Sequence, residues 1–285
     1  MIQINKFLVV GGDLRNVELA KLLKEDGKTV YTYGMNINSS EPLEKILEDV
    51  EAVIGPIPFS RDGLTVNSTF AKSQILIKDL LEKIKGKILI AGNVSEDIIK
   101  MAQKYNIKVI DVMKNEKLAI LNTIATAEGT IELMIANTNT IIFDSNVLIL
   151  GFGRVAKTLA NRLKGLVKSV TCASRENGEL TWIEVYGFKK IDLNILNQSQ
   201  DLLKILSNFD VIINTIPSMI LDAKKLQYIK KDALLIDLAS NPGGIDNEVA
   251  KKQGLKLIHA LGLPGKVAPV SSAKFIKDII YDVVK

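Results

Sequence analysis

Short apolar runs rich in Val, Ile and Leu alternate along this chain with longer segments whose apolar residues recur at helical spacing. Apolar runs of this kind, closed by glycine or polar residues, predict strands that are buried on both faces of a parallel sheet. The alternation runs through one half of the chain and then starts again, which predicts an α/β fold of two domains. In the first half, the predicted strands are 6–10, 29–33, 52–54, 87–91 and 108–111, and the predicted helices are 16–23, 41–47, 78–84 and 97–104. In the second half, the predicted strands are 147–150, 169–173, 188–191, 210–215, 233–238 and 255–259, and a helix is predicted at 157–163.

A long helical pattern between Glu116 and Asn137 connects the two halves. We therefore predict an N-terminal substrate domain of the Rossmann or flavodoxin type over residues 1–118, followed by a linking helix over 119–142. Residues 143–266 are expected to form a C-terminal NAD(P)-binding Rossmann domain. The last segment, 267–285, contains a helical pattern and is expected to pack back onto the first domain.

The most informative motif is the turn that follows the run 147–150. It reads Gly151-x-Gly153-x-x-Ala156 and leads directly into a helical pattern, which is the context of a dinucleotide fingerprint. Gly151 permits a tight turn, Gly153 lets the backbone approach a pyrophosphate, and Ala156 keeps the helix close to the strand. A glycine turn can also end a strand for packing reasons alone, but the complete series of strands and helices downstream favours nucleotide binding. The predicted cofactor-binding residues are Gly151, Gly153, Arg154, Val155, Ser174, Arg175, Thr215, Pro217 and Leu238.

The second predicted strand of this half ends in Ser174 and Arg175, where NAD-specific enzymes usually place an acidic residue. An acid would repel a 2′-phosphate, whereas an arginine binds one through charge-assisted hydrogen bonds. This difference favours NADP over NAD. Glu176 leaves NAD open, because a shift of one residue would restore the acid, and Arg175 could instead be a solvated loop cation.

The composition limits the other classes of function. The 285 residues are 47% hydrophobic and 24% charged, which is typical of a soluble globular protein. The longest apolar stretches, such as 211–213, are too short to span a bilayer, and the first residues carry no export signal, so we expect neither membrane insertion nor export. The net charge of +5 comes from lysines scattered among acids, and aromatic residues make up only 5% of the chain, which argues against nucleic-acid binding.

The single cysteine, Cys172, excludes an intrachain disulfide and fits a reducing cytoplasm. It falls in a predicted strand, so we interpret it as a packing residue rather than a nucleophile. The sequence has no Cys/His cluster and no H-E-x-x-H motif, so no metal site is predicted.

Polar residues at the ends of predicted strands are candidates for substrate binding and proton transfer. Arg15 follows Asp13 at the end of the first strand, and its guanidinium could bind a substrate carboxylate in bidentate fashion. The alternative is that Asp13 caps the next helix and Arg15 lies at the surface. Ser95 is a further candidate, although its position is also typical of an N-cap. His259, the only histidine, ends the last strand and is either a proton carrier or a structural residue.

Several longer motifs follow one another along the chain. They are Gly11-Gly12-Asp13-x-Arg15, Thr126-Ala127-Glu128-Gly129-Thr130, Gly151-Phe152-Gly153-Arg154, Asn214-Thr215-Ile216-Pro217-Ser218, Asp237-Leu238-Ala239-Ser240-x-Pro242-Gly243-Gly244-x-Asp246 and Gly262-Leu263-Pro264-Gly265-x-Val267-Ala268-Pro269. Together they resemble the dipicolinate synthase A-subunit family of spore-forming bacteria over nearly the whole chain. The last two motifs are unusual enough to make this resemblance specific.

The resemblance implies oxidation of dihydrodipicolinate to dipicolinate with NADP in the mother-cell cytoplasm during sporulation. It also implies a partner, the B subunit of dipicolinate synthase, and it leaves a homodimer open. Oxidation of the ring removes a hydride and a proton, and the two substrate carboxylates need cations or N–H donors. On this hypothesis, Arg15, Ser95 and Lys266 bind the substrate, while Glu128 or His259 receives the proton.

Related families supply the alternatives. D-2-hydroxyacid dehydrogenases match less well, because Ser240 stands where they place an arginine and their Pro-His pair is missing. The run from Asp237 to Gly244 is closer to alanine dehydrogenase and transhydrogenase, although Asn241 and Pro242 replace their polar pair. An amino-acid or imino-acid dehydrogenase is therefore the second hypothesis, and a non-catalytic nucleotide-binding subunit is the third.

Overall fold

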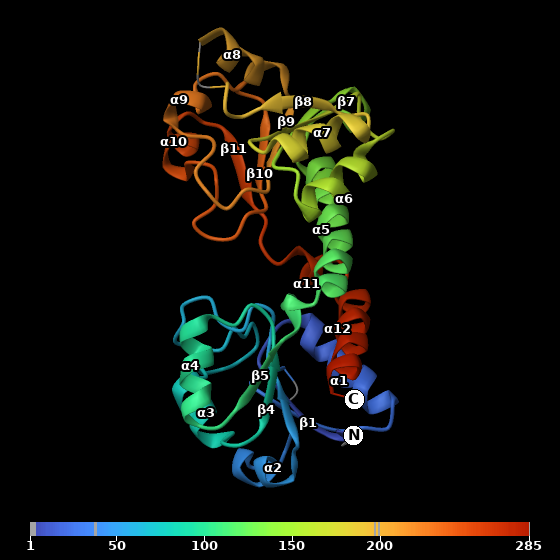
Figure 1. Cartoon of the computed structure of the whole chain (residues 1–285), viewed down its shortest axis with the longest axis vertical. Coiled ribbons are helices and arrows are strands. Elements are labelled where there is room, and N and C mark those ends of the chain that lie inside the picture. The colour runs from blue at the N-terminus through green and yellow to red at the C-terminus, as the bar shows by residue number, and fades with distance from the viewer. Residues whose placement is uncertain (1–3, 37–38, 197, 199, 285) are drawn as a thin grey trace. The chain divides into compact units, whose positions relative to one another are not determined.

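The computed structural model describes residues 4–36, 39–196, 198 and 200–284 (Figure 1). The chain forms two compact units. The first comprises the residues up to Asn122 and those from Pro264 onward, and the second runs from Thr123 to Leu263. Residues 1–3, on which the expectation about export partly depends, and Lys285 of the last predicted segment lie outside the described residues.

The first unit contains a five-stranded parallel sheet with the order β2-β1-β3-β4-β5. Its strands are β1 (Lys6–Val10), β2 (Thr29–Tyr33), β3 (Ala52–Ile54), β4 (Ile88–Ala91) and β5 (Lys108–Asp111). Its helices are α1 (Leu14–Glu25), α2 (Leu43–Asp49), α3 (Ile77–Lys83), α4 (Glu96–Lys104) and α12 (Pro269–Val283), with a 3-10 turn at Val112–Lys114. The strand order reverses between β1 and β3, so the loops after these two strands flank the switch point of the sheet.

Two hydrophobic clusters cover the two faces of this sheet. Phe7 and Val9 of β1 belong to the cluster with α1 and α12, whereas Leu8 and Val10 belong to the cluster with α2, α3 and α4 (Figure 1). This division follows from the alternation of side chains along a strand. Ile276 and other apolar residues of α12 pack in the first cluster, so the C-terminal helix completes the core of the unit that begins the chain.

The second unit contains a six-stranded parallel sheet with the order β11-β10-β9-β6-β7-β8. Its strands are β6 (Asn146–Leu150), β7 (Ser169–Ser174), β8 (Lys189–Asp192), β9 (Val211–Asn214), β10 (Leu234–Asp237) and β11 (Lys256–His259). Its helices are α6 (Arg154–Leu163), α7 (Asn177–Val185), α8 (Gln200–Lys204), α9 (Ala223–Leu226) and α10 (Asn247–Lys252), with 3-10 turns at Ile142–Asp144 and Ile205–Asn208. This is the strand order of a doubly wound Rossmann sheet, with its switch point between β6 and β9. The predicted α/β fold class is therefore confirmed.

The helices α5 (Glu116–Asn137) and α11 (Leu263–Val267) each begin in one unit and end in the other. The linking helix was predicted over 119–142, but α5 ends at Asn137. The side chains of Asn137 and Thr138 donate hydrogen bonds to the carbonyls of Leu133 and Met134. Bonds of this kind compete with the backbone pattern of a continuing helix, which explains the earlier end.

Within the described residues, α5 is the one helix that is long and apolar enough to cross a membrane, with a mean hydropathy of 1.3. The short apolar runs considered in the sequence did not reveal this, because Thr, Asn and Glu residues interrupt the helix. Length and composition do not separate a membrane span from a core helix. Ala127 and Met134 of α5 are fully buried in the hydrophobic core of the second unit.

Candidate functional site

The turn after β6 lies at the switch point of the second sheet. Gly151 has a φ of +99°, which residues with a side chain rarely adopt. A Cβ atom on Gly151 would lie 2.4 Å from Thr215 Oγ1 at the end of β9, so the glycine also allows these strand ends to meet. Thr215 donates to the Leu150 carbonyl through its hydroxyl at 2.8 Å and its backbone N–H at 2.9 Å. The turn is thereby fixed to the neighbouring strand.

The helix α6 starts beside this turn without a side-chain cap. Gly153 is its N-cap residue, and no side-chain hydrogen bond closes the helix end. A Cβ atom on Gly153 would meet no heavy atom within 4 Å, so there is open space next to the helix start. Ala156, fully buried, lets the helix pack closely in the core. Because the first N–H groups of a helix lack intrahelical acceptors and carry partial positive charge, this end of α6 suits a phosphate.

A groove of about 420 Å³ surrounds this turn, which is a volume typical of small-molecule sites. The predicted cofactor residues that line it are Gly151, Gly153, Arg154, Val155, Ser174, Arg175, Thr215 and Pro217. Leu238 lies apart from this set: it is half-buried and packs against the hydrophobic core of the unit. The groove therefore gathers residues from the ends of β6, β7 and β9.

Glu179 is a groove residue that the sequence analysis missed. Ser174 Oγ donates to Glu179 Oε2 at 2.5 Å and accepts from the Glu176 backbone N–H at 3.1 Å. The Ser174 proton is therefore directed to a carboxylate. Glu176 and Glu179 both line the groove beside Arg175, which is exposed and forms no ion pair among the described residues. A search for acids one helical turn beyond the strand end would have found Glu179.

At the carboxyl edge of the second sheet, the strand register places Leu150, Asn214, Asp237 and His259 in one row. With neighbouring strands about 4.8 Å apart, His259 lies roughly 14 Å along this row from Leu150. The His259 side chain is 40% exposed, and its Nδ1 lies 4.0 Å from Asp237 Oδ2. This distance is beyond a hydrogen bond, so the imidazole and the carboxylate are neighbours without a direct bond between them.

Asp237 itself is fully buried and organises the loop that follows β10. Its carboxylate accepts hydrogen bonds from the Asn214 amide at 2.8 Å and from the backbone N–H groups of Ala239 at 3.0 Å and Gly244 at 2.9 Å. The loop therefore wraps around a buried anion. This arrangement fixes the chain next to His259.

Glu128, the other candidate proton acceptor, lies on the exposed surface of α5. Its Oε1 is 3.5 Å from Arg162 Nη2 of α6, and both side chains are largely exposed. Glu128 and His259 therefore have separate charged partners, an arginine for one and an aspartate for the other.

In the first unit, the turn after β1 holds an internal ion pair. Asp13 is the N-cap of α1 and accepts from the Arg15 backbone N–H at 3.0 Å. Arg15 Nε donates to both oxygens of Asp13 at 3.0 and 3.2 Å, and its Nη2 donates to Asp13 Oδ2 at 2.8 Å and to the Ile57 carbonyl at 2.6 Å. The Arg15 side chain is only 5% exposed. Asp13 is thus the helix cap considered above, but Arg15 is buried and its guanidinium already binds a carboxylate.

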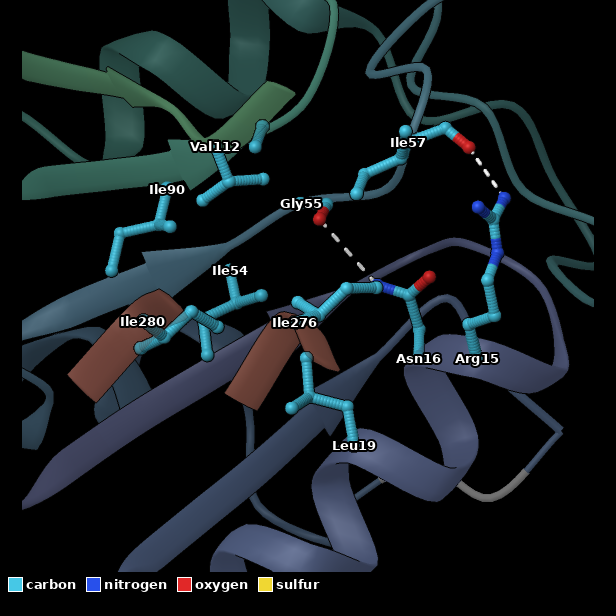
Figure 2. Close-up of a pocket in the computed structure, with 11 residues that line it drawn as sticks. Arg15, Asn16, Leu19, Ile54, Gly55, Ile57, Ile90, Val112, Ile276 and Ile280 are labelled. Atoms are coloured by element: carbon cyan, nitrogen blue, oxygen red, sulfur yellow. Dashed lines mark hydrogen bonds between the residues drawn. The ribbon is translucent and has the colours of Figure 1, made fainter. Parts of the chain in front are cut away.

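Figure 2 shows Arg15 and Asn16 at one side of a small cavity in the first unit. Asn16 Nδ2 donates to the Gly55 carbonyl at 3.4 Å, and isoleucines such as Ile54 and Ile276 form most of the remaining wall. The volume is about 10 Å³, which is room for one water molecule at most. This cavity is too small for a substrate.

The other two predicted substrate residues are exposed. A Cβ atom on Gly265 of α11 would lie 2.4 Å from Asp13 Oδ2 and 3.0 Å from Arg15 Nε, so the first and last motifs of this unit are in contact. Lys266 follows this glycine and is exposed. Ser95 occupies the N-cap position of α4, but its side chain makes no capping hydrogen bond.

Cys172 is buried in β7, and burial raises the pKa of its thiol to about 12. The thiol is therefore protonated at neutral pH, which does not suit a nucleophile. Among the described residues, no group of three or more His, Cys, Asp or Glu side chains is arranged to hold a metal ion.

These features define a class of protein, a two-unit α/β protein with a dehydrogenase-type NAD(P)-binding domain. Residues 125–283 match the family model "Alanine dehydrogenase/PNT, C-terminal domain". The transhydrogenase of Sinorhizobium meliloti has the same fold, with a TM-score of 0.66 and 15% identity over 97% of this chain and 92% of that one.

Residues 6–113 match a second family model, which describes the N-terminal domain of the dipicolinate synthase A subunit. The dipicolinate synthase A subunit of Bacillus subtilis (strain 168) is 30% identical over 290 aligned positions, which cover 96% of this chain and 94% of the relative. The crystal structure of the dipicolinate synthase A subunit from Bacillus halodurans matches with a TM-score of 0.85 and 28% identity, over 100% of this chain and 99% of that chain. The chain belongs to the dipicolinate synthase A-subunit family.

Proposed function

We propose that the chain oxidises dihydrodipicolinate to dipicolinate, pyridine-2,6-dicarboxylate, with NADP as hydride acceptor. The observation that carries this proposal is membership of the dipicolinate synthase A-subunit family, in a chain whose second unit has an open groove at the Gly151 turn. The same membership supports the B subunit of dipicolinate synthase as a partner and a role in the mother-cell cytoplasm of a sporulating bacterium. A homodimer is a further partner hypothesis, which light scattering of the purified chain tests.

The groove at Gly151 fits a dinucleotide phosphate bridge. Gly153 leaves space beside the start of α6, and the helix N-terminus there provides N–H donors and partial positive charge. Arg175 would bind the 2′-phosphate of NADP, whereas Glu176 and Glu179 oppose it by like charge. When bound, the oxidised nicotinamide supplies the hydride acceptor, and the balance among these three side chains decides between NADP and NAD.

Aromatisation of the substrate ring releases a proton together with the hydride. His259 is our first candidate to receive this proton, because its exposed imidazole ends β11 and faces the buried Asp237 carboxylate at 4.0 Å. Glu128 is the second candidate. Its ion pair with Arg162 would have to loosen before the carboxylate could accept a proton.

In the first unit, Ser95 and Lys266 are exposed and available to contact the substrate. Arg15 has a different role in this proposal, because its guanidinium holds Asp13 and the Ile57 carbonyl. It would therefore position the start of α1 and the neighbouring Gly265 rather than grip a substrate carboxylate directly.

A direct assay tests the proposal. Dihydrodipicolinate is generated in situ, and the chain is added with NADP or NAD, each with and without the B subunit, while dipicolinate formation is followed. We expect cofactor-dependent product, faster with NADP. Absence of product in every combination would contradict the proposed reaction, and NADP binding without turnover would instead support a non-catalytic nucleotide-binding subunit.

The match of residues 125–283 to the alanine dehydrogenase/PNT domain favours one second candidate, an amino-acid or imino-acid dehydrogenase. The same assay with NAD and small amino acids, or with NADH, ammonia and small oxo acids, distinguishes the two reactions, because only the proposed one requires a cyclic dicarboxylate.

A further inference from the structure

A second groove lies entirely within the first unit, beside the turn that follows β1. It is formed by residues 61–75 of the long connection between β3 and α3. Two backbone hydrogen bonds tie this connection to the turn after β1: the Gly12 N–H donates to the Asn67 carbonyl, and the Thr69 N–H donates to the Gly12 carbonyl, both at 2.9 Å. Parallel α/β sheets bind their ligands near the carboxyl ends of their strands, and this connection follows the carboxyl end of β3.

Two cations line this groove, whose volume is about 390 Å³. Arg61 and Lys72 are both exposed, and neither forms an ion pair within the described parts of the chain. Arg61 Nε donates to Asn67 Oδ1 at 3.3 Å, which orients the guanidinium without neutralising its charge. This is the opposite of Arg15, whose charge is compensated by Asp13 inside the protein.

One carboxylate, Asp62, also lines the groove, but its hydrogen-bonding capacity is used by its own loop. The Thr65 backbone N–H and hydroxyl, the Leu64 backbone N–H and the Ser60 hydroxyl all donate to it at 2.7 to 3.0 Å. These bonds, led by that of the Thr65 N–H, hold the pKa of Asp62 well below its usual value. With two cations and one carboxylate among these side chains, the groove retains a positive balance.

The same groove has an apolar side. Val66, Ala71 and Ile75 contribute to its lining, and the Val66 N–H donates to the Ile75 carbonyl at 2.9 Å, which holds the two arms of the connection together. A ligand that fits this lining has an apolar face and anionic ends. A planar ring with carboxylate substituents has both properties.

We propose that this groove is a carboxylate-binding site of the first unit and binds a small planar dicarboxylate. The ring rests against Val66 and Ile75, and Arg61 and Lys72 bind the carboxylates. The identity of the ligand as a pyridine-2,6-dicarboxylate or its dihydro form rests on the proposed function. The groove assigns carboxylate recognition to Arg61 and Lys72, which lie outside the family motifs.

Calorimetric titration of the full-length chain tests this site, with pyridine-2,6-dicarboxylate as the probe and buffer free of divalent cations, with and without saturating NADP. Arg61→Gln and Lys72→Gln should each weaken binding about tenfold, because each removes a charge-assisted hydrogen bond. Lys100→Gln, which removes an exposed lysine of α4, is the matched control and should change the affinity less than twofold. Circular dichroism and NADP affinity confirm that each variant is folded.

Pyridine-2-carboxylate, isophthalate and glutarate complete the set of probes. The one-carboxylate probe should bind more weakly than the dicarboxylates and lose less affinity in the single variants. Equal dicarboxylate affinity in the wild-type chain and both variants would overturn the groove assignment and leave the proposed reaction intact. No dicarboxylate binding by the wild-type chain would overturn it as well. Arg61-dependent binding of isophthalate without any dipicolinate formation would support the groove and reject the proposed reaction.

Discussion

In each unit, the first strand of a parallel sheet ends in a glycine turn that leads into a helix, Gly11–Gly12 after β1 and Gly151 after β6. The residues at the two helix starts have similar extended backbones, with φ −120° and ψ −163° at Asp13 and φ −74° and ψ −167° at Gly153. Their surroundings differ. Asp13 fills the start of α1 with its own carboxylate, whereas the space next to Gly153 is open.

The comparison shows how one βα unit either binds an external anion or excludes it. Both helix starts carry partial positive charge, which favours an anion. In the first unit, Asp13 supplies that anion and Arg15 balances its charge. In the second unit, no side chain takes this place, so a ligand phosphate can. The difference between the two units lies at the N-cap position of the helix, which is Asp13 in α1 and Gly153 in α6.

The largest effect is expected from Arg15→Ala. The substitution leaves the Asp13 carboxylate without its cation and the Ile57 carbonyl without its donor, and we expect a loss of about 3 kcal/mol in the stability of the first unit. Urea unfolding followed by circular dichroism measures this loss. Trp182, the only tryptophan, lies in the second unit, so its fluorescence transition should remain unchanged.

Arg61→Gln is the matched control, because Arg61 is an exposed arginine of the same unit and its loss should change stability by less than about 0.5 kcal/mol. If Arg15→Ala unfolded like the wild-type chain but raised the KM for substrate, Arg15 would bind the substrate directly. The interpretation that its guanidinium serves to hold Asp13 at the start of α1 would then be wrong.

The second prediction concerns a substitution that gives the turn after β6 the same N-cap residue as the turn after β1. Gly153→Asp places a carboxylate at the start of α6, where the backbone is already extended as at Asp13. We expect cofactor affinity to fall about 100-fold, because the new charge occupies the phosphate position and repels it, while stability changes by only a few tenths of a kcal/mol. Fluorescence titration with NADP measures the affinity. Unchanged affinity would mean that the phosphates bind elsewhere.

The central strands of both sheets, such as β1, β6, β9 and β10, were predictable from the sequence because they are mainly continuous apolar runs that end at a polar or glycine residue. The helices α7 to α10 received no assignment. In α7, Trp182, Val185 and Tyr186 near its end are exposed, so its apolar residues do not form one inward-facing stripe. The sequence pattern therefore describes the strands better than the short helices that cover them.

The parts of the site that are close together in the sequence were predictable, whereas the parts that depend on contacts between distant segments were not. The Gly151 turn is local, and its residues were recognised from one short motif. The burial of Arg15 depends on Ile57, which approaches from a different strand end, and the Arg61 groove depends on a long connection folding back to β1. Such contacts between distant segments leave no spacing signal in a single sequence.

A third, smaller effect concerns the charged side chains that set the preference for NADP or NAD in the groove at Gly151. Arg175→Ala should weaken NADP binding about tenfold and NAD binding little, because only NADP has the 2′-phosphate. Glu179→Gln keeps an acceptor for the Ser174 hydroxyl but removes a charge, so it should shift the NADP-to-NAD affinity ratio in the opposite direction. Parallel titrations with both cofactors provide the ratios. An Arg175→Ala variant with equal losses for NADP and NAD would exclude 2′-phosphate recognition by this residue.

The smallest effect concerns α12, the C-terminal helix that packs on the first unit. Asp26, at the end of α1, accepts from Lys277 Nζ and Tyr281 Oη of α12, both at 2.7 Å, and these bonds lower the pKa of its carboxyl. A lowered folded-state pKa means that the stabilisation is present above the unfolded value of about 3.9 and is lost as the pH falls through the folded value.

Because Asp26 is about one-third exposed, solvent screens the interaction and the contribution should be only about 0.5 kcal/mol. Asp26→Asn removes it, so the variant should be less stable than the wild-type chain at pH 7, and this difference should shrink as the pH falls through the folded-state pKa. Urea unfolding of the first unit across this pH range measures the difference. A constant difference at all pH values would show that the Asp26 charge does not hold α12 in place, and that the apolar face containing Ile276 and Ile280 alone secures the C-terminal helix on the first unit.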